Sequence, residues 1–245
     1  MINLIIDIGN SRTKIALFNQ HDLMFNVPLD HLTANHVKML KNEHPQLKKA
    51  ILSSVKPYNE ELKRVLSKEF DQYIELDHLT ELPIENLYET PETLGKDRIA
   101  AAVGANELFP DRNLLVIDAG TAITYDLVSE KNQFIGGNIS PGLEMRFKAL
   151  NQFTGKLPLV NYSDDFEHIG KNTTDAIRAG VQNGVLFEME QNIEYFNENY
   201  QNLHIIMTGG DSNFFDKKLN YSIFVNFNLT LIGLNRILEH NAKKK

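Results

Sequence analysis

The sequence predicts an α/β protein of two duplicated domains, residues 1–112 and 113–245. Apolar β-rich runs alternate with helical patterns along the chain, as they do in α/β proteins. The phrase "DIGNSRTK", which begins at Asp7, has a near copy in "DAGTAIT", which begins at Asp118. The two phrases lie roughly 110 residues apart, about one small domain, and each belongs to a predicted three-strand meander. We therefore expect an internal duplication in which each copy brings one Asp and Gly hairpin to a shared cleft.

In the first half, hydrophobic periodicity and turn residues define the expected elements. They are strands over 3–9, 13–19 and 22–29, a helix over 33–44 capped by Thr33, a strand over 48–55, and helices over 60–70 and 98–109. Asp97 lies just ahead of the Ala-rich third helix, and Pro110 ends it.

In the second half the meander restarts. The expected elements are strands over 113–120, 121–129 and 134–140, helices over 142–151 and 173–196, strands over 203–210 and 222–226, and a helix over 229–240. The Gly-rich segment "TGGDSNFF" at 208–215 allows two interpretations, a loop that closes over a nucleotide base and ribose or a tight strand-to-helix turn.

Composition excludes several classes of protein. The chain has 42% hydrophobic residues, in short runs without a membrane span or a secretory signal, so we expect a cytoplasmic protein that binds no membrane. The net charge of -7 argues against a nucleic-acid partner, and the basic tail Lys243–Lys245 is expected to be a solvated end. The absence of cysteine excludes disulfides and thiolate chemistry, and the scattered histidines indicate no transition-metal site.

Both hairpins have the chemistry that a phosphate requires. Glycine lets backbone N–H groups approach closely, and Ser11, Thr13 and Thr121 add hydroxyl groups. Lys14 adds a positive charge, and a strand-end Asp is suited to hold hydrated Mg²⁺. One such hairpin alone is more often a simple turn, but two at domain spacing favour phosphate binding. Neither a P-loop nor a dinucleotide-binding motif is present.

The motifs "DIGNSRTK", "GKDR", "DAGTAIT", "GGNISPG" and "TGGD", in this order over nearly the whole chain, resemble those of the type III pantothenate kinases. These belong to the acetate kinase, sugar kinase, Hsp70 and actin superfamily. The resemblance implies two ribonuclease H-like domains with a nucleotide cleft between them. It also implies an alcohol phosphotransferase that converts pantothenate to 4'-phosphopantothenate with ATP and Mg²⁺, the first step of coenzyme A biosynthesis. A homodimer and a monovalent cation, K⁺ or NH₄⁺, are implied as well.

The resemblance also implies residue roles. The ATP phosphates would contact Asp7, Ile8, Gly9, Asn10, Ser11, Arg12, Thr13, Lys14 and Thr121, and Asp7 would face Mg²⁺ directly or through water. Asp118 would hold the monovalent cation. Pantothenate would contact Tyr88, Gly95, Lys96, Asp97, Arg98 and Thr173, with Asp97 as the proton acceptor and Arg98 on the substrate carboxylate.

Several alternatives stay open at this point. Asp97 could be only a helix cap, and Arg98 only a member of an ion pair. Asp126 and Asp211 are taken as structural, and the segment 136–142 either lies beneath the phosphates or is a rigid connector. The rival functions are a non-catalytic regulatory or binding protein of the same fold, and a kinase or phosphatase of another small metabolite.

Overall fold

A computed structural model describes residues 2–242, so the predicted tail Lys243–Lys245 lies outside the described residues. Contacts divide the chain into two compact units. The first unit holds the residues up to Asp111, the segment Glu130–Ile135 and the residues from Asn228 onward. The second holds Arg112–Ser129 and Gly136–Phe227.

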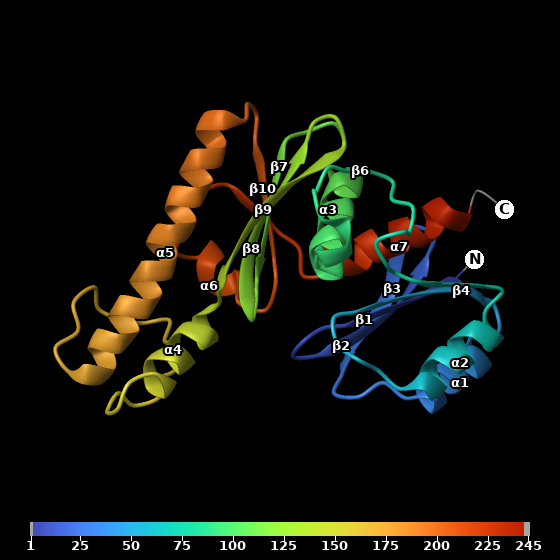
Figure 1. The fold of residues 1–245 in the computed structure, drawn as a ribbon, viewed down its shortest axis with the longest axis horizontal. Helices are drawn as coiled ribbons and strands as arrows, with labels where there is room; N and C mark the ends of the chain where they lie inside the picture. The colour runs from blue at the N-terminus through green and yellow to red at the C-terminus, as the bar shows by residue number, and fades with distance from the viewer. Residues whose placement is uncertain (1, 243–245) are drawn as a thin grey trace. The chain divides into compact units, whose positions relative to one another are not determined.

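The first unit is built on a five-stranded sheet in the order β3-β2-β1-β4-β5. Its strands β1, β2, β3 and β4 are labelled in Figure 1. Its strands are β1 (Ile2–Ile8), β2 (Thr13–Asn19), β3 (Asp22–Leu29), β4 (Leu47–Ser54) and β5 (Gln72–Glu75). Its helices are α1 (Ala34–Glu43), α2 (Glu60–Glu69), the 3₁₀ turn η1 (Pro91–Thr93), α3 (Lys96–Leu108) and α7 (Leu229–Ala242). β1 pairs antiparallel with β2 and parallel with β4, so the carboxyl ends of β1 and β4 lie side by side.

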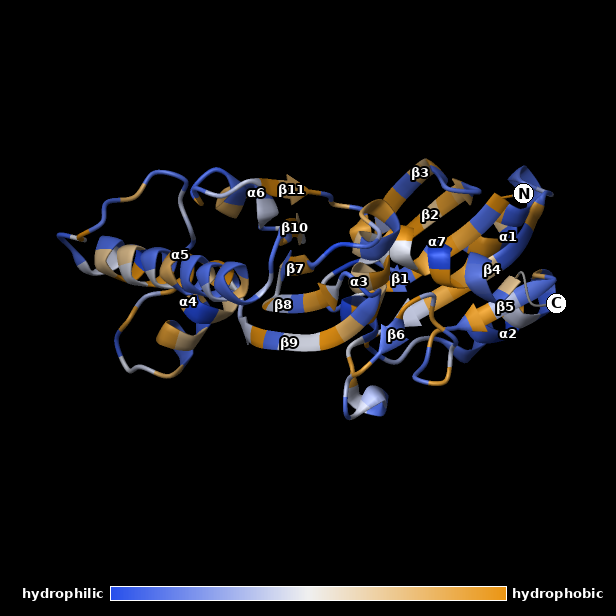
Figure 2. Cartoon of the chain, turned by 90° about the horizontal axis from the view of Figure 1, so that it is seen from above, coloured by the Kyte–Doolittle hydropathy of each residue, from blue (hydrophilic) through white to orange (hydrophobic). Residues whose placement is uncertain are grey.

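The two faces of this sheet differ in character. Every second residue of β1, including Leu4 and Ile6, packs into a core with Val37 of α1 and Leu62 of α2. On the other face, the Nδ2 of the fully buried Asn3 donates to Asn235 Oδ1 of α7 at 2.8 Å and to Glu239 Oε1 at 2.7 Å. In Figure 2 the middle of β2 is orange, the colour of hydrophobic residues. The face that carries Asn3 also carries Asp7, because side chains alternate along a strand.

Helices α3 and α7 pack closely because glycine lies at their contact. A Cβ atom added to Gly104 would collide with the backbone of Leu229, and one added to Gly233 would collide with the carbonyl of Ala100. Small residues therefore allow the two helix backbones to approach, and the Ala-rich composition of α3 serves this packing.

The second unit holds most of a six-stranded sheet in the order β11-β10-β7-β8-β9-β6. The strands are β6 (Glu85–Asn86), β7 (Leu114–Ala119), β8 (Ala122–Ser129), β9 (Gln133–Pro141), β10 (His204–Thr208) and β11 (Ile223–Val225). The short β6 and the first residues of β9 belong to the first unit. Helices α4 (Leu143–Gln152), α5 (Thr173–Asn199) and α6 (Ser212–Asp216) complete the second unit, in which α5 is the long helix of Figure 1.

Most predicted elements are confirmed, and β2 and β3 have the predicted bounds. Thr33 caps α1 as expected, since its hydroxyl accepts from the backbone N–H of His36. The short elements β5, β6, η1 and α6 were not predicted, because so few residues give no readable periodicity. The boundaries of the compact units are not those of the two predicted halves, which meet at residue 112. The C-terminal helix α7 belongs to the first unit because it packs against α3 and the first sheet.

No helix among residues 2–242 is long and apolar enough to cross a membrane.

Candidate active site

The first Asp and Gly hairpin presents exposed loop residues next to a buried carboxyl group. The loop between β1 and β2 is closed by a hydrogen bond of 3.1 Å from the Gly9 N–H to the Arg12 carbonyl. Asn10, Ser11 and Arg12 are exposed, whereas Ile8 and Thr13 are buried. The loop can therefore offer backbone and side-chain donors to an anion, while Ile8 contributes its side chain to the core.

Asp7 is the buried member of this hairpin, with 9% of its surface exposed. Burial raises the pKa of its carboxyl from 3.8 to about 6, the charge of Lys14 opposes this rise, and the charge of Asp97 adds to it. Its Oδ1 is buried and has no hydrogen-bond partner in the described part of the chain. Such a carboxylate lacks the compensation that burial requires, and a hydrated divalent cation would supply it.

The "GKDR" segment forms the first turn of α3. The helix begins at Lys96, two residues earlier than predicted, so Asp97 lies inside its first turn. The alternative that Asp97 caps the helix is wrong, because Gly95 is the N-cap residue. The Asp97 Oδ1 accepts a hydrogen bond of 2.9 Å from the backbone N–H of Arg98. The negative charge of Asp97 also raises the pKa of Asp7, so the two carboxyl groups interact electrostatically.

Arg98 follows Asp97 on α3 and therefore projects from a different side of the helix. Its side chain lies against two aromatic rings. Its guanidinium carbon is 5.6 Å from the ring centre of Tyr88 and 6.0 Å from that of Phe134. The two rings are themselves 6.1 Å apart. Arg98 is 6% exposed and Phe134 is fully buried, so this cluster is well packed. Sequence reasoning missed Phe134, because only its place in an apolar strand run was visible.

Lys96 points to a third side of the same helix. It lines a hollow of about 220 Å³ together with Leu76, His78 and Glu92 among others. The pKa of Glu75 on β5 is lowered, against the effect of burial, by hydrogen bonds from Lys63 and Tyr58 and by the charges of Lys63 and Lys96. Lys96, Asp97 and Arg98 thus have separate surroundings, as successive residues of a helix turn must.

The second hairpin, in the second unit, connects β7 to β8. Asp118 on β7 pairs in register with Thr124 on β8, and the Gly120 N–H donates to the Ala122 carbonyl at 3.0 Å. The Thr121 carbonyl accepts from the N–H of Gly142 at 3.0 Å. This last contact explains "GGNISPG", because Gly142 brings the start of α4 directly onto the hairpin.

The "TGGD" segment also packs on the second hairpin. Gly209 has φ +98, and a Cβ atom there would lie 2.5 Å from Asp118 Oδ1 and collide with the Ala119 carbonyl. The N–H of Asp211 donates to that carbonyl at 2.9 Å. Glycine is needed at 209 for both its backbone conformation and this close approach. The segment leads into the short helix α6, and the Asp211 carboxyl has a pKa raised by burial and by Glu144.

Thr173 lies on a different element from the other predicted residues of its unit, at the start of α5. It is the first residue of α5, is exposed, and follows the N-cap Asn172, whose side chain accepts from the Asp175 N–H at 3.0 Å. Thr173 therefore offers its hydroxyl at a helix start but makes no described contact with the second hairpin within residues 2–242.

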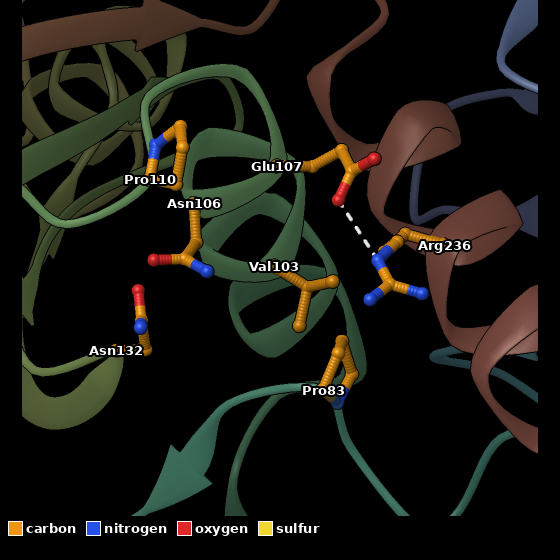
Figure 3. A pocket seen from close by; sticks show the side chains of 7 residues that line it. All are labelled: Pro83, Val103, Asn106, Glu107, Pro110, Asn132 and Arg236. Atoms are coloured by element: carbon orange, nitrogen blue, oxygen red, sulfur yellow. Dashed lines mark ion pairs between the residues drawn. The ribbon is translucent and has the colours of Figure 1, made fainter.

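A cavity of about 410 Å³ in the first unit is separate from these residues. Its lining consists of Pro83, Val103, Asn106, Glu107, Pro110, Asn132 and Arg236 (Figure 3). An ion pair of 2.8 Å between Arg236 Nε and Glu107 Oε2 joins α7 to α3 at its wall. None of the predicted site residues is among these seven, so the cavity lies outside the predicted site. Likewise, no cluster of three or more acidic or histidine side chains that could hold a metal occurs in the described residues.

Solved structures of other proteins have the same fold. An activator of 2-hydroxyisocaproyl-CoA dehydratase from Clostridium difficile, solved with ADPNP, has 13% identity and a TM-score of 0.57, with 100% of this chain and 96% of that chain covered. A glucokinase from an Antarctic psychrotroph has 12% identity and a TM-score of 0.54, with 98% and 99% covered. These likenesses show a mixed α/β fold with two sheets, which this chain shares with both proteins.

Sequence comparison then identifies the family. Residues 3–195 match the family model for type III pantothenate kinase. The type III pantothenate kinases of Phocaeicola vulgatus and Bacteroides fragilis strain YCH46 are each 46% identical to this chain, over 242 and 240 residues. The alignments cover 99% of this chain and 100% of the first relative, and 98% of this chain and 98% of the second. The chain belongs to the type III pantothenate kinase family.

Proposed function

We propose that this protein transfers the terminal phosphoryl group of ATP to the hydroxyl of pantothenate that becomes phosphorylated in 4'-phosphopantothenate. Family membership carries this assignment, and it is supported by the electrostatic interaction of Asp7, which adjoins an exposed loop, with Asp97. ATP and a divalent cation are the co-substrate and cofactor of such a kinase. Because ATP is used in the cytoplasm, we infer that the enzyme acts there.

The first hairpin is proposed as the phosphate and cation site. The exposed backbone of Asn10, Ser11 and Arg12 can donate to phosphate oxygens, and Lys14 can add positive charge. Asp7 fits a divalent cation, because its Oδ1 is buried without a partner among the described residues. When bound, the cation neutralises negative charge on the phosphates.

Asp97 is proposed as the proton acceptor. The pantothenate oxygen forms a bond to the γ-phosphorus, the bond from that phosphorus to the oxygen of the leaving ADP breaks, and the hydroxyl proton passes to Asp97. Phosphoryl transfer depends mostly on positioning and charge neutralisation, so a carboxylate is a sufficient base. Its hydrogen bond from the Arg98 N–H fixes the direction of the carboxylate.

Arg98 is proposed to bind the pantothenate carboxylate through its guanidinium fork. Tyr88 and Phe134 hold the guanidinium in place by contact with their rings.

Gly95, Lys96 and Thr173 are also proposed to contact the substrate, because they match the motifs of the family. In the second unit, Thr121 is proposed to contact ATP and Asp118 to bind K⁺ or NH₄⁺.

Arg98→Ala is expected to raise the KM for pantothenate by about tenfold to a hundredfold, with a smaller change in kcat. This corresponds to roughly 1.5–3 kcal/mol, the contribution of a hydrogen bond to a charged group. Steady-state kinetics with varied pantothenate measure it. Because Arg98 is buried, Arg98→Lys serves as a second variant that keeps the charge and most of the volume. A KM for pantothenate that stays at the wild-type value in both variants would remove this role.

We also propose a homodimer, assembled through the second unit. Several large apolar side chains of this unit are exposed, and we propose that they form the dimer interface. They are Met145, Phe153, Leu159, Ile169, Phe187 and Tyr195. A second copy of the chain is the proposed occupant of this surface.

Light scattering is expected to give about twice the chain mass of 28.0 kDa. Phe187→Asp should shift the protein toward the monomer, because a charge would be buried at the apolar interface. Met24→Asp, at an exposed apolar position on β3 of the first unit, is the matched control and should leave the dimer intact. A wild-type monomer with full activity would contradict the proposal.

The two halves of the chain, 1–112 and 113–245, are further proposed to be ribonuclease H-like domains that arose by duplication. The equivalent positions of Asp7 and Asp118, each on the first strand of an antiparallel hairpin, support this.

A coupled assay of ADP release over a panel of small alcohols tests the function. We expect turnover with pantothenate and little with sugars or other hydroxy acids. A Campylobacter jejuni protein named as a conserved Baf family transcriptional activator shares the fold, at 24% identity and a TM-score of 0.62 with 98% of this chain and 99% of that chain covered. An absence of turnover on the whole panel would favour such a regulatory or binding role.

A further inference from the structure

Ser53 is a buried hydroxyl group that the fold itself does not use. It lies at the carboxyl end of β4 with no exposed surface, and its Oγ has no hydrogen-bond partner within the described chain. A buried polar atom without a partner costs free energy, and alanine would avoid that cost. A buried hydroxyl without a partner at a strand end therefore indicates that its hydrogen-bond partner belongs to a bound ligand and not to the protein.

Asp7 lies directly beside Ser53. The parallel strands β1 and β4 place Asp7 opposite Ser53 in register, and in-register side chains of neighbouring strands project to the same face. Asp7 Oδ1 is likewise buried and lacks a hydrogen-bond partner among residues 2–242. Two orphan oxygens, one charged and one neutral, thus lie on neighbouring strand ends.

The next residue gives an internal comparison. Ser54 projects to the opposite face of β4, and its hydroxyl donates to the Lys56 carbonyl and accepts from the Lys56 N–H at 3.3 Å. Ser54 is therefore satisfied by the turn after β4, whereas Ser53, at similar burial, is not. The turn therefore provides hydrogen-bond partners for the hydroxyl of Ser54 but none for that of Ser53.

We propose that Ser53 is a further, uncharged member of the divalent-cation site at Asp7. Its hydroxyl would hydrogen-bond a water of the cation's hydration shell, a water that the Asp7 carboxylate also holds. Mg²⁺ keeps several waters in proteins and is bound by few carboxylates, so groups that hold those waters contribute to its binding. A hydroxyl suits this place because it can donate or accept. This inference rests on the proposed cation site at Asp7.

The test compares Ser53→Ala with Ser54→Ala. The readouts are the melting temperature with ADP over a range of Mg²⁺ concentrations, and the Mg²⁺ dependence of pantothenate phosphorylation. For Ser53→Ala we expect an unchanged or higher melting temperature without ligands, and an Mg²⁺ requirement about threefold to tenfold higher in both assays. Ser54→Ala should lower the melting temperature and keep the wild-type Mg²⁺ requirement. Ser53→Thr, which keeps the hydroxyl, should restore that requirement.

A wild-type Mg²⁺ requirement in Ser53→Ala would overturn the inference, whatever the melting temperature of that variant. If Ser53→Ala does not fold, Ser53→Cys gives the same readouts, since it keeps the size but has only a weak donor. Asp7→Asn distinguishes failure of the Ser53 assignment from failure of the cation site. If the Mg²⁺ requirement rises in Asp7→Asn but not in Ser53→Ala, the role of Ser53 is rejected and the cation site stands. If it rises in neither variant, the cation site itself is rejected.

Discussion

Asp97→Asn is expected to lower kcat for pantothenate phosphorylation by about 10²-fold or more, the usual scale for general acid–base catalysis. The amide keeps the size of the side chain but cannot accept the hydroxyl proton. ATP binding should change little, because the phosphate loop lies on the first hairpin. The stability should fall by less than about 1 kcal/mol, since Gly95 and not Asp97 is the N-cap and only a first-turn charge is lost.

Glu61→Gln is the matched control for this variant. Glu61 is likewise an acidic residue in the first turn of a helix of the first unit, and it is exposed. It should show the same small loss of melting temperature with unchanged kcat. Paired melts and steady-state kinetics decide the matter, because a near-normal kcat in folded Asp97→Asn would remove the catalytic role.

Asp7→Asn is expected to abolish most Mg²⁺-dependent activity and, at the same time, to stabilise the free protein. The pKa of Asp7 is raised from 3.8 to about 6, so burial disfavours its charged form in the folded state. This destabilisation is complete above pH 6 and fades as the pH falls through 6 toward 3.8, where the unfolded chain also becomes protonated. A neutral amide removes a penalty of about 3 kcal/mol at neutral pH.

Thermal melts from pH 4 to 8 test this prediction. The wild-type protein should lose stability as the pH rises through that window, and the Asp7→Asn protein should show less of that loss. Asp22→Asn, at an exposed position of β3, should keep the wild-type pH profile. Unchanged melting temperatures together with unchanged activity would show that the buried charge of Asp7 does not destabilise the folded protein and that Asp7 is not part of the cation site. Gain of stability with loss of function is typical of active-site carboxylates.

The sequence by itself determined the local architecture and the chemistry. The alternation of apolar residues gave the bounds of β2 and β3, and Thr33 marked the start of α1. These are properties of neighbouring residues, which a periodic pattern records. The repeated Asp and Gly hairpin also pointed to phosphate and cation binding, because few residue types allow that chemistry.

Only the tertiary structure decided which distant residues share a site. Ser53 became notable because β4 lies parallel to β1 and in register with Asp7, and Phe134 because β9 brings it to Arg98. The same is true of α7, whose return to the first unit depends on glycines at its contact with α3. Burial and the pKa of Asp7 follow from such packing. They depend on contacts between residues far apart in the chain, which local sequence patterns do not encode.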